Sequence, residues 1–403
     1  MEDFSEQQQL FMRRAIEIGE CGRITTPPNP WVGCVLVKNG KILSEGYHEY
    51  PGGPHAEEIA IRKAHVSLEG AQVYLSLEPC SHYGKQPPCT DLLIKHRVAE
   101  VFIALKDPDC RVSGKGIESL KNVGIRVHVG LEEARARKSL QPYLYQRSSC
   151  SPWVVLKSAA SIDGQVADRN SQSQWITCPE ARHDVGFIRA CSQAVIVGAG
   201  TVIADNPKLT ARRASGELYA RQPLRVVLDS SGRVPKESQV FHLGGEVLYV
   251  TTERCPSQHL QYLEALGVEI ACVKASSSGV DLHEVMRLLA NKHFLQVLVE
   301  GGATVHTEFL KHHRLAGPGQ RPFTPSTGVQ IPLGTPTRNQ GTCSDAGAFF
   351  VSALAGDREG FLVRDMLCAS VHGELGWLRQ GRVACGGDLF FRTEQPPHPG
   401  SPE

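Results

Sequence analysis

The sequence lacks an excess of charge of either sign. Its 403 residues carry 43 basic and 42 acidic side chains, so the formal net charge is only +1. No overall field draws the protein toward nucleic acid, and no basic patch interleaved with aromatic residues marks an RNA or DNA surface. The sequence also lacks the roughly 20 consecutive apolar residues that span a bilayer. We therefore expect partners that are neither nucleic acids nor membranes.

A secretory leader and a regular cysteine framework are missing as well. The N-terminal stretch begins with acidic residues and spaces its apolar residues as a surface helix does, unlike the basic start and apolar run of a signal peptide. The 13 cysteines are odd in number and scattered, which disfavours a disulfide scaffold. We expect reduced thiols and a cytoplasmic protein.

Two successive α/β patterns divide the chain. Residues 31–50 hold two extended runs around an Asn39-Gly40 turn, which predicts a β-hairpin, and helices and strands alternate after it. This alternation predicts an α/β sandwich around one sheet. The polar stretch 139–151 ends the first pattern and marks a boundary. We predict a first domain over residues 1–146.

The second pattern consists of short apolar strands that end in Gly, Asp or Glu, with helical segments between them. Such strands suit a parallel sheet that carries a ligand at its C-terminal edge. We predict that this second domain covers residues 152–315. From Ala316 the chain becomes rich in Gly, Pro, Ser and Thr, so we expect residues 316–403 to be an atypical, largely disordered region.

Three short motifs predict a metal site in the first domain. His55 begins a predicted helix, and Cys80 and Cys89 each follow a proline. One imidazole and two thiolates make a three-ligand tetrahedral zinc site whose fourth position stays open for water, which is typical of catalytic zinc. Glu57 lies two residues beyond His55, so it can move protons between that water and a leaving amine without ligating the metal.

This order of motifs is that of the zinc deaminases, except that eight residues rather than two separate the cysteines. We therefore predict hydrolytic deamination with Glu57 as the catalytic acid and base. A closed structural zinc site, or two unrelated buried cysteines beside a helix-capping histidine, is a competing interpretation. A noncatalytic zinc-stabilised binding module and a deaminase of nucleic acids or free nucleosides also stay open.

The first domain contains the segments TPPNPWVGCVLV, GYHEYPGGPHAE and LEPCSHYGKQPPCTDLL, and the second contains KSAASIDGQVA, SQWIT and VLVEGGATVHTEFL. These segments resemble the bifunctional deaminase/reductase family of riboflavin biosynthesis, in which a long insert between the two cysteines is common. The resemblance covers residues 1 to about 315. It implies a cytidine-deaminase-like α/β/α sandwich followed by a dihydrofolate-reductase-like α/β domain, with Zn²⁺ and NADPH as cofactors.

The resemblance implies two consecutive reactions on a small-molecule pyrimidine nucleotide, carried out by a homodimer or higher homo-oligomer. The first domain would deaminate 2,5-diamino-6-(5-phosphoribosylamino)pyrimidin-4-one to 5-amino-6-(5-phosphoribosylamino)uracil. The second would reduce the ribosyl group to ribityl with NADPH. The deaminase substrate contacts implied by the family are Asn29, His48, His82 and Lys85.

For the reductase, the resemblance implies two groups of residues. The cofactor group is Ala159, Trp175, Thr177, Thr201, Asp205, Ser230, Gly301 and Gly302. The substrate group is Ser173, Arg189, Leu209, Arg212 and Glu300. Chemistry supports part of this: Gly198 and Gly200 admit a phosphate close to the backbone, and the two arginines can clamp one through paired hydrogen bonds. Lys157 and Asp163 are candidates for orienting the open-chain sugar or relaying a proton, and a structural ion pair is equally consistent.

The chain departs from the family pattern at its C-terminal end. Family members continue after this point into strands that complete the reductase sheet, whereas this chain enters the Gly/Pro-rich run at Ala316. We therefore expect an edge strand to be missing, which leaves unpaired backbone groups and a weakened sheet. The alternative that follows is a deaminase whose second domain has lost reduction.

Overall fold

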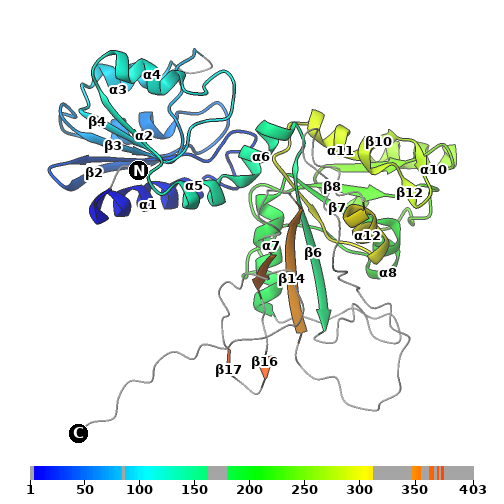
Figure 1. Cartoon of the computed structure of the whole chain (residues 1–403). Coiled ribbons are helices and arrows are strands. Elements are labelled where there is room, and N and C mark those ends of the chain that lie inside the picture. Colours follow the sequence, from blue (N-terminus) through cyan, green and yellow to red (C-terminus); the bar gives the residue numbers. More distant parts are fainter. Residues whose placement is uncertain are drawn as a thin grey trace, which may run out of the picture.

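The structure, a computed structural model, describes residues 4–83, 87–161, 179–311, 347–354, 363–366, 370–371 and 374–375. Two α/β domains follow one another along the chain, with two short helices, α5 (Glu133–Ser139) and α6 (Gln141–Ser149), leading from the first to the second (Figure 1). No helix within these residues is long and apolar enough to cross a membrane.

Helix α6 occupies most of the polar stretch that we interpreted as a boundary. Pro142 stands in its first turn, where a proline removes no intrahelical hydrogen bond. The residue that suggested an interruption therefore begins a helix, and the connection between the domains is helical. The exact domain limits stay predictions.

The first domain is built on a five-stranded sheet with the order β2-β1-β3-β4-β5. Its strands are β1 (Gly33–Lys38), β2 (Lys41–Tyr47), β3 (Gln72–Leu75), β4 (Glu100–Ile103) and β5 (Arg126–Val129). β1 pairs antiparallel with β2 and β3, and β3, β4 and β5 are parallel. The predicted hairpin is confirmed, because Asn39 and Gly40 both have positive φ (53° and 71°), as a tight two-residue turn requires.

Helices cover both faces of this sheet. One face carries α1 (Glu6–Glu20) and α5, and the other carries α2 (Ala56–Lys63), α3 (Cys89–Lys95) and α4 (Lys115–Asn122). Met12 and Phe102 lie in the core beneath α1, and Leu93 and Leu120 lie in the core on the opposite face. This arrangement is the three-layer α/β/α sandwich that the sequence predicts.

The second domain contains an eight-stranded sheet with the order β10-β9-β8-β7-β13-β6-β14-β15. Its strands are β6 (Trp153–Ser161), β7 (Ala194–Gly198), β8 (Leu224–Leu228), β9 (Val247–Thr251), β10 (Glu269–Cys272), β13 (Gln296–Val299), β14 (Gly347–Leu354) and β15 (Val363–Met366). The run from β10 to β6 is parallel, as the short apolar strands predict. Their C-terminal ends therefore meet at one edge of the sheet.

Helices lie on both faces of the second sheet as well. They are α7 (Pro179–Cys191), α8 (Ala199–Asp205), α9 (Gln239–His242), α10 (Ser257–Ala265), α11 (Leu282–Asn291) and α12 (Ala303–Lys311). Val202 and Leu263 place α8 and α10 against one face, while Leu289 and Phe309 place α11 and α12 against the other. Two small ladders complete the described elements: β11 (Ala275–Ser276) with β12 (Gly279–Val280), and β16 (Ser370–Val371) with β17 (Glu374–Leu375).

The expectation of a missing edge strand is wrong for β6. β14 pairs with it antiparallel over eight residues, from Gly347 opposite Ser161 to Leu354 opposite Val154, and β15 pairs with β14 (Figure 1). The apolar, β-branched and aromatic composition of residues 347–354 suits a strand. Most of the region 316–403 lies outside the described residues, and its disorder stays a prediction.

The two domains share part of a hydrophobic core. Leu295, which directly precedes β13, is 1% exposed and belongs to the same cluster as Trp31 and Tyr143 of the first domain. Ile24 of the first domain packs in turn against a small cluster of the second domain that includes Tyr219. Apolar surface of each domain is thus buried by the other, which couples their stabilities.

Replacing Leu295 with alanine should destabilise the protein by about 2–5 kcal/mol, because the surrounding side chains of the first domain cannot fully close the cavity. Urea unfolding followed by circular dichroism measures the change. Leu266→Ala is the matched control, since Leu266 is 40% exposed and its truncation should cost about 0.5 kcal/mol or less. Equal effects of the two substitutions would contradict a shared core.

Candidate active sites

The first site lies where two helices begin. α2 starts directly after His55, and Cys89 is the first residue of α3. Cys80 lies in the loop that follows β3. His55 Nδ1 is 3.5 Å from Cys80 Sγ and 3.3 Å from Cys89 Sγ, and the three ligand atoms lie within 4.8 Å of one another. Residues far apart in the chain therefore converge as the three motifs predict.

The spacing of these atoms fits zinc. Zinc bonds of about 2.0–2.1 Å to nitrogen and 2.3 Å to sulfur, at tetrahedral angles, separate the two ligand atoms by about 3.5 Å. Within the part of the chain that the structure describes, His55, Cys80 and Cys89 are the only such group of three or more metal-binding side chains, and no fourth joins them. A tetrahedral ion held here keeps one position for a ligand from outside the protein.

Hydrogen bonds between the three ligands shift their pKa values. The hydrogen bond with Cys89 lowers the pKa of the Cys80 thiol well below its usual value and raises that of Cys89. The hydrogen bond with Cys80 raises the pKa of His55 to about 9. The backbone N–H of Cys89 also donates to Cys80 Sγ at 3.4 Å. Together these contacts favour a thiolate at Cys80, which is the form that binds metals.

Glu57 lies beside this group without belonging to it. It is the second residue of α2, it is buried, and its carboxyl contacts the thiol of Cys89. Burial raises the pKa of this carboxyl, and the neighbouring His55 opposes the rise. The carboxyl therefore lies next to the ligands but is not one of them, which is the arrangement that its spacing from His55 predicts.

Asn29 and His48 form a hydrogen-bonded pair next to the metal ligands. His48 Nδ1 lies 2.9 Å from the carbonyl oxygen of Pro54, which only accepts, so this nitrogen carries the proton. His48 Nε2 then accepts from Asn29 Nδ2 at 3.0 Å, which leaves Asn29 Oδ1 to accept from another group. The rings of His48 and His55 meet edge to face, 5.2 Å apart. These two predicted substrate contacts thus lie at the metal site.

The loop between Cys80 and α3 carries the other predicted substrate residues. His82 Nδ1 is buried and makes no hydrogen bond among the described residues. Lys85 lies outside the described residues, so its contact with substrate stays a prediction.

Glu78 is a residue of this site that sequence reasoning missed. Its buried carboxylate accepts backbone N–H groups from Asp107 (3.2 Å), Gly114 (3.0 Å), Gly116 (3.0 Å) and Ile117 (3.3 Å). A Cβ on Gly116 would lie 2.2 Å from the carbonyl oxygen of residue 79, so the loop rests directly on the chain next to Cys80. Glu78 therefore positions a metal ligand without touching the metal.

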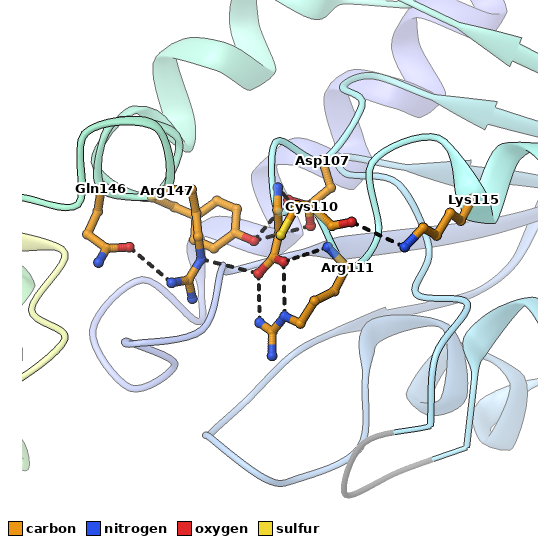
Figure 2. A network of polar contacts seen from close by, with 8 residues as sticks. Asp107, Cys110, Arg111, Lys115, Gln146 and Arg147 are labelled. Atoms are coloured by element: carbon orange, nitrogen blue, oxygen red, sulfur yellow. Dashed lines mark hydrogen bonds and ion pairs between the residues drawn. The ribbon is translucent and has the colours of Figure 1, made fainter. Parts of the chain in front are cut away.

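The same loop is fastened to α6 by a polar network (Figure 2). Asp109 pairs with Arg111 at 2.6 Å and with Arg147 of α6 at 3.6 Å. Hydrogen bonding from Arg111 lowers the pKa of Asp109 to about 2. Tyr143 of α6 donates to Asp107 at 3.0 Å. The backbone next to Cys80 is thus connected, through this loop, to the helix that leads into the second domain.

Glu78→Gln should weaken zinc binding about 10–100-fold, because the amide cannot accept all four N–H donors and the loop behind Cys80 loosens. It should also cost roughly 1–3 kcal/mol for each donor left unsatisfied. Chelator competition measures the affinity, and thermal melting the stability. Glu69→Gln is the control, because Glu69 is exposed and makes only a 3.5 Å ion pair with Arg97. Unchanged zinc affinity in Glu78→Gln would refute the positioning role.

The second site lies at the C-terminal edge of the parallel sheet. Glu300 directly follows β13 and is buried, and Arg189 of α7 faces it with two hydrogen bonds, one of them 2.7 Å from Nη2 to Oε2. Lys157 of β6 interacts electrostatically with Glu300 and Arg189, and also with Asp205 of α8. Burial lowers the pKa of Lys157, and Glu300 opposes that shift.

The sequence analysis did not foresee the partner of Arg189. Its guanidinium is held by Glu300 and donates at 3.0 Å to the carbonyl of Thr210, so its fork faces the protein. Arg212 Nε donates to Thr210 Oγ1 at 2.8 Å, and Leu209 is buried with a φ of 55°. Leu209 and Arg212 therefore flank the residue that Arg189 contacts. Phosphate binding by either arginine stays a prediction.

The glycines of the predicted cofactor site allow close packing. A Cβ on Gly301 would lie 2.7 Å from Thr201 Oγ1, and Gly302 has a φ of 76°. Both positions therefore require glycine, and both lie against Thr201. Gly198 packs against α12, which accounts for that residue without a ligand, whereas a Cβ on Gly200 would meet open space.

The remaining predicted reductase residues divide into two sets. Ala159 lies on β6 opposite Phe349 of β14, and Ser230 follows β8, where its carbonyl accepts from Thr252 Oγ1 at 2.7 Å. The residues outside the described part of the chain are Asp163, Ser173, Trp175 and Thr177.

Comparison with known proteins decides the family. The model of the cytidine and deoxycytidylate deaminase zinc-binding region matches residues 5–105, and that of the RibD C-terminal domain matches residues 152–315. The riboflavin biosynthesis protein RibD of Chlamydia pneumoniae is 61% identical over 311 residues, covering 77% of this chain and 83% of that protein. RibD of Escherichia coli strain K12 is 38% identical over 308 residues, covering 74% and 83%. The chain belongs to the RibD family.

Solved RibD structures share the fold. Acinetobacter baumannii RibD matches with a TM-score of 0.68 at 39% identity, covering 77% of this chain and 85% of that one. A Thermotoga maritima structure, described as a diaminohydroxyphosphoribosylaminopyrimidine deaminase/5-amino-6-(5-phosphoribosylamino)uracil reductase, matches with a TM-score of 0.67 at 39% identity, covering 76% and 84%. Both structures span the two domains that the chain contains.

Membership of the RibD family confirms the resemblance and both fold classes inferred from the sequence. It makes the chain a riboflavin biosynthesis protein that combines a hydrolytic deaminase with a reductase. Its cofactors are zinc and NADPH, and the group His55, Cys80 and Cys89 fits the former. The first domain is accordingly called the deaminase domain below, and the second the reductase domain.

Proposed function

We propose that the deaminase domain converts 2,5-diamino-6-(5-phosphoribosylamino)pyrimidin-4-one to 5-amino-6-(5-phosphoribosylamino)uracil, and that the reductase domain then reduces the ribosyl group of this product to ribityl. The Thermotoga maritima relative is named for this deaminase and this reductase. The observation that carries the proposal is the three-ligand group His55, Cys80 and Cys89 with the buried carboxyl of Glu57 beside it.

In the deamination, zinc bound by the three ligands supplies a Lewis acid that lowers the pKa of a water molecule toward neutrality. Glu57 moves both protons of the water: as the C–O bond forms, one passes to the ring nitrogen of the reacting C=N bond, and the other then passes to the exocyclic nitrogen. The C–N bond breaks, ammonia leaves, and the oxygen from water becomes the ring carbonyl. Asn29, whose amide orientation is set by His48, offers Oδ1 to an N–H group of the pyrimidine.

Glu57→Gln should lower the kcat of ammonia release by about 10²–10⁴-fold, because an amide cannot accept and return the proton. Zinc content should stay unchanged, since Glu57 is not among the metal-binding residues. Glu58→Gln is the control, because Glu58 is the neighbouring residue and pairs with Arg62 at the helix surface. A fully active Glu57→Gln protein would favour the noncatalytic zinc module.

In the reduction, NADPH bound in the second domain supplies a hydride. The carbon that accepts the hydride is C1′ of the ribosyl group, whose bond to the ring oxygen breaks, and Lys157 gives the proton to that oxygen. Burial lowers the pKa of Lys157, which makes its ammonium a better acid. Glu300 orients Lys157 and is itself held by Arg189. Because β14 pairs with β6, the strand that carries Lys157 has a backbone partner on each side, which supports a working reductase.

Lys157→Met should lower NADPH oxidation by about 10²–10⁴-fold and leave ammonia release unchanged, because only the reductase loses its proton donor. Lys292→Met is the control, since Lys292 pairs with Glu269 at the surface. The measurement supplies the pyrimidine substrate with NADPH and follows ammonia and NADPH in one reaction. If the wild-type protein releases ammonia but consumes no NADPH, the deaminase-only alternative replaces the bifunctional one.

The proposed setting is the cytoplasm, with a small nucleotide as substrate. None of the nine cysteines of the described residues is in a disulfide, which supports a reducing compartment. The homodimer or higher homo-oligomer that the family implies stays a prediction.

A further inference from the structure

One side chain of the reductase domain reaches the deaminase domain close to its substrate residues. Arg221, three residues before β8, donates through Nη1 to the carbonyl of Pro27 at 2.8 Å and to the carbonyl of Ile24 at 3.3 Å. Both acceptors belong to residues 24–29, the loop that ends at Asn29. We call this stretch the substrate loop.

The deaminase domain holds the substrate loop from its other side. Thr25 Oγ1 donates to the carbonyl of Glu49, and Thr26 Oγ1 donates to the carbonyl of His48 at 2.7 Å. Asn29 Nδ2 donates to the ring of His48 at 3.0 Å. The loop thus lies between the turn that carries His48 and the guanidinium of Arg221, and a shift at either side moves Asn29 relative to the metal ligands.

The segment that carries Arg221 is internally braced. Gln222 Nε2 donates to the carbonyls of Ala211 (3.0 Å) and Tyr219 (2.7 Å), and Gln222 Oε1 accepts from Ala211 N at 2.8 Å. The backbone of Tyr219 also donates to that of Ala211, and Ile24 packs against both residues. These hydrogen bonds hold residues 211–222 together as one unit. The backbone that carries Arg221 is therefore fixed.

The same segment touches the reductase site. The carbonyl of Thr210, directly before the braced unit, accepts from Arg189, which is paired with Glu300. The contact that reaches the substrate loop is therefore anchored, at its other end, to residues predicted to bind the reductase substrate.

We infer that Arg221 is a positioning residue of the deaminase reaction, supplied by the reductase domain. It fixes the substrate loop so that Asn29 meets the pyrimidine, while His55, Cys80, Cys89 and Glu57 are held by α2, α3 and the loop after β3. This inference rests on the proposed deaminase function. It separates substrate binding, which depends on Arg221, from the proton transfer and the metal, which do not.

Arg221→Ala in the full chain should raise the KM for ammonia release about tenfold and change kcat less than about twofold, because the loop shifts but Glu57 and the ligands do not. Zinc content and NADPH oxidation with the deaminated product should stay at the wild-type level. Arg221→Lys, which keeps a donor for one carbonyl, should recover part of the KM. Arg287→Ala is the control, since Arg287 is an exposed arginine of the reductase domain that pairs with Glu284 on its own helix, α11.

Hydrogen exchange gives a readout that needs no substrate. The amides of Thr25 and Thr26, which donate to the carbonyl of Gly22, and that of Asn29, which donates to the carbonyl of Thr26, should exchange faster in Arg221→Ala than in the wild type or in Arg287→Ala. An unchanged KM with unchanged exchange would overturn the positioning role. So would a parallel fall of kcat, zinc content and NADPH oxidation, because that pattern indicates lost folding. Failure of the wild-type protein to release ammonia would instead refute the proposed function, and faster loop exchange would then report the contact alone.

Discussion

The deaminase site depends on the meeting of two helix N-termini with one loop. α2 begins directly after His55 and α3 begins at Cys89, and the partial positive charges of these helix ends favour the thiolates and the anionic ligand that a catalytic zinc requires. The loop after β3 brings Cys80 to the same point. If any one of these three segments moved away, only two protein ligands would remain. Two ligands cannot hold a tetrahedral zinc ion that has a single free coordination position. The buried carboxylate of Glu78 explains how the loop, which has no regular structure of its own, is held accurately enough.

The reductase site is organised differently, around buried charge. Glu300 lies at the end of a central strand, and the guanidinium of Arg189 compensates its charge through two parallel hydrogen bonds. Because the guanidinium is planar and rigid, forming both bonds costs little additional side-chain entropy. Lys157 enters the same environment from the neighbouring strand. Burying the charges of Arg189, Glu300 and Lys157 costs desolvation free energy unless opposite charges lie close together. The negative charge of Glu300 between two positive charges therefore helps to hold all three side chains in place. Strand order accounts for the meeting of Glu300 with Lys157, since β13 lies beside β6, and Arg189 reaches them from helix α7.

Sequence reasoning succeeded where the signal was local. A few adjacent residues are enough to predict the placement of Glu57 beside His55 and the turn at Asn39-Gly40. Distant residues were brought together correctly where a motif identified each of them, as it did for His55, Cys80 and Cys89. No motif pairs Arg189 with Glu300, which are separated by 111 positions. The pairing of β14 with β6 was missed for the same reason, because an apolar run after a Gly/Pro-rich stretch does not show which strand it will join. Glu78 was overlooked because its four partners are backbone groups, which carry no side-chain signature.

Leu295 has a consequence for how the chain is divided. The family boundary near residue 150 separates two activities, but it does not separate two independent hydrophobic cores, since a leucine from beyond the boundary completes the core around Trp31 and Tyr143. In a deaminase domain produced without the reductase domain, the apolar side chains that Leu295 covers would be exposed to water. Anyone who wishes to use the first catalytic half alone therefore has to redesign that surface with polar residues.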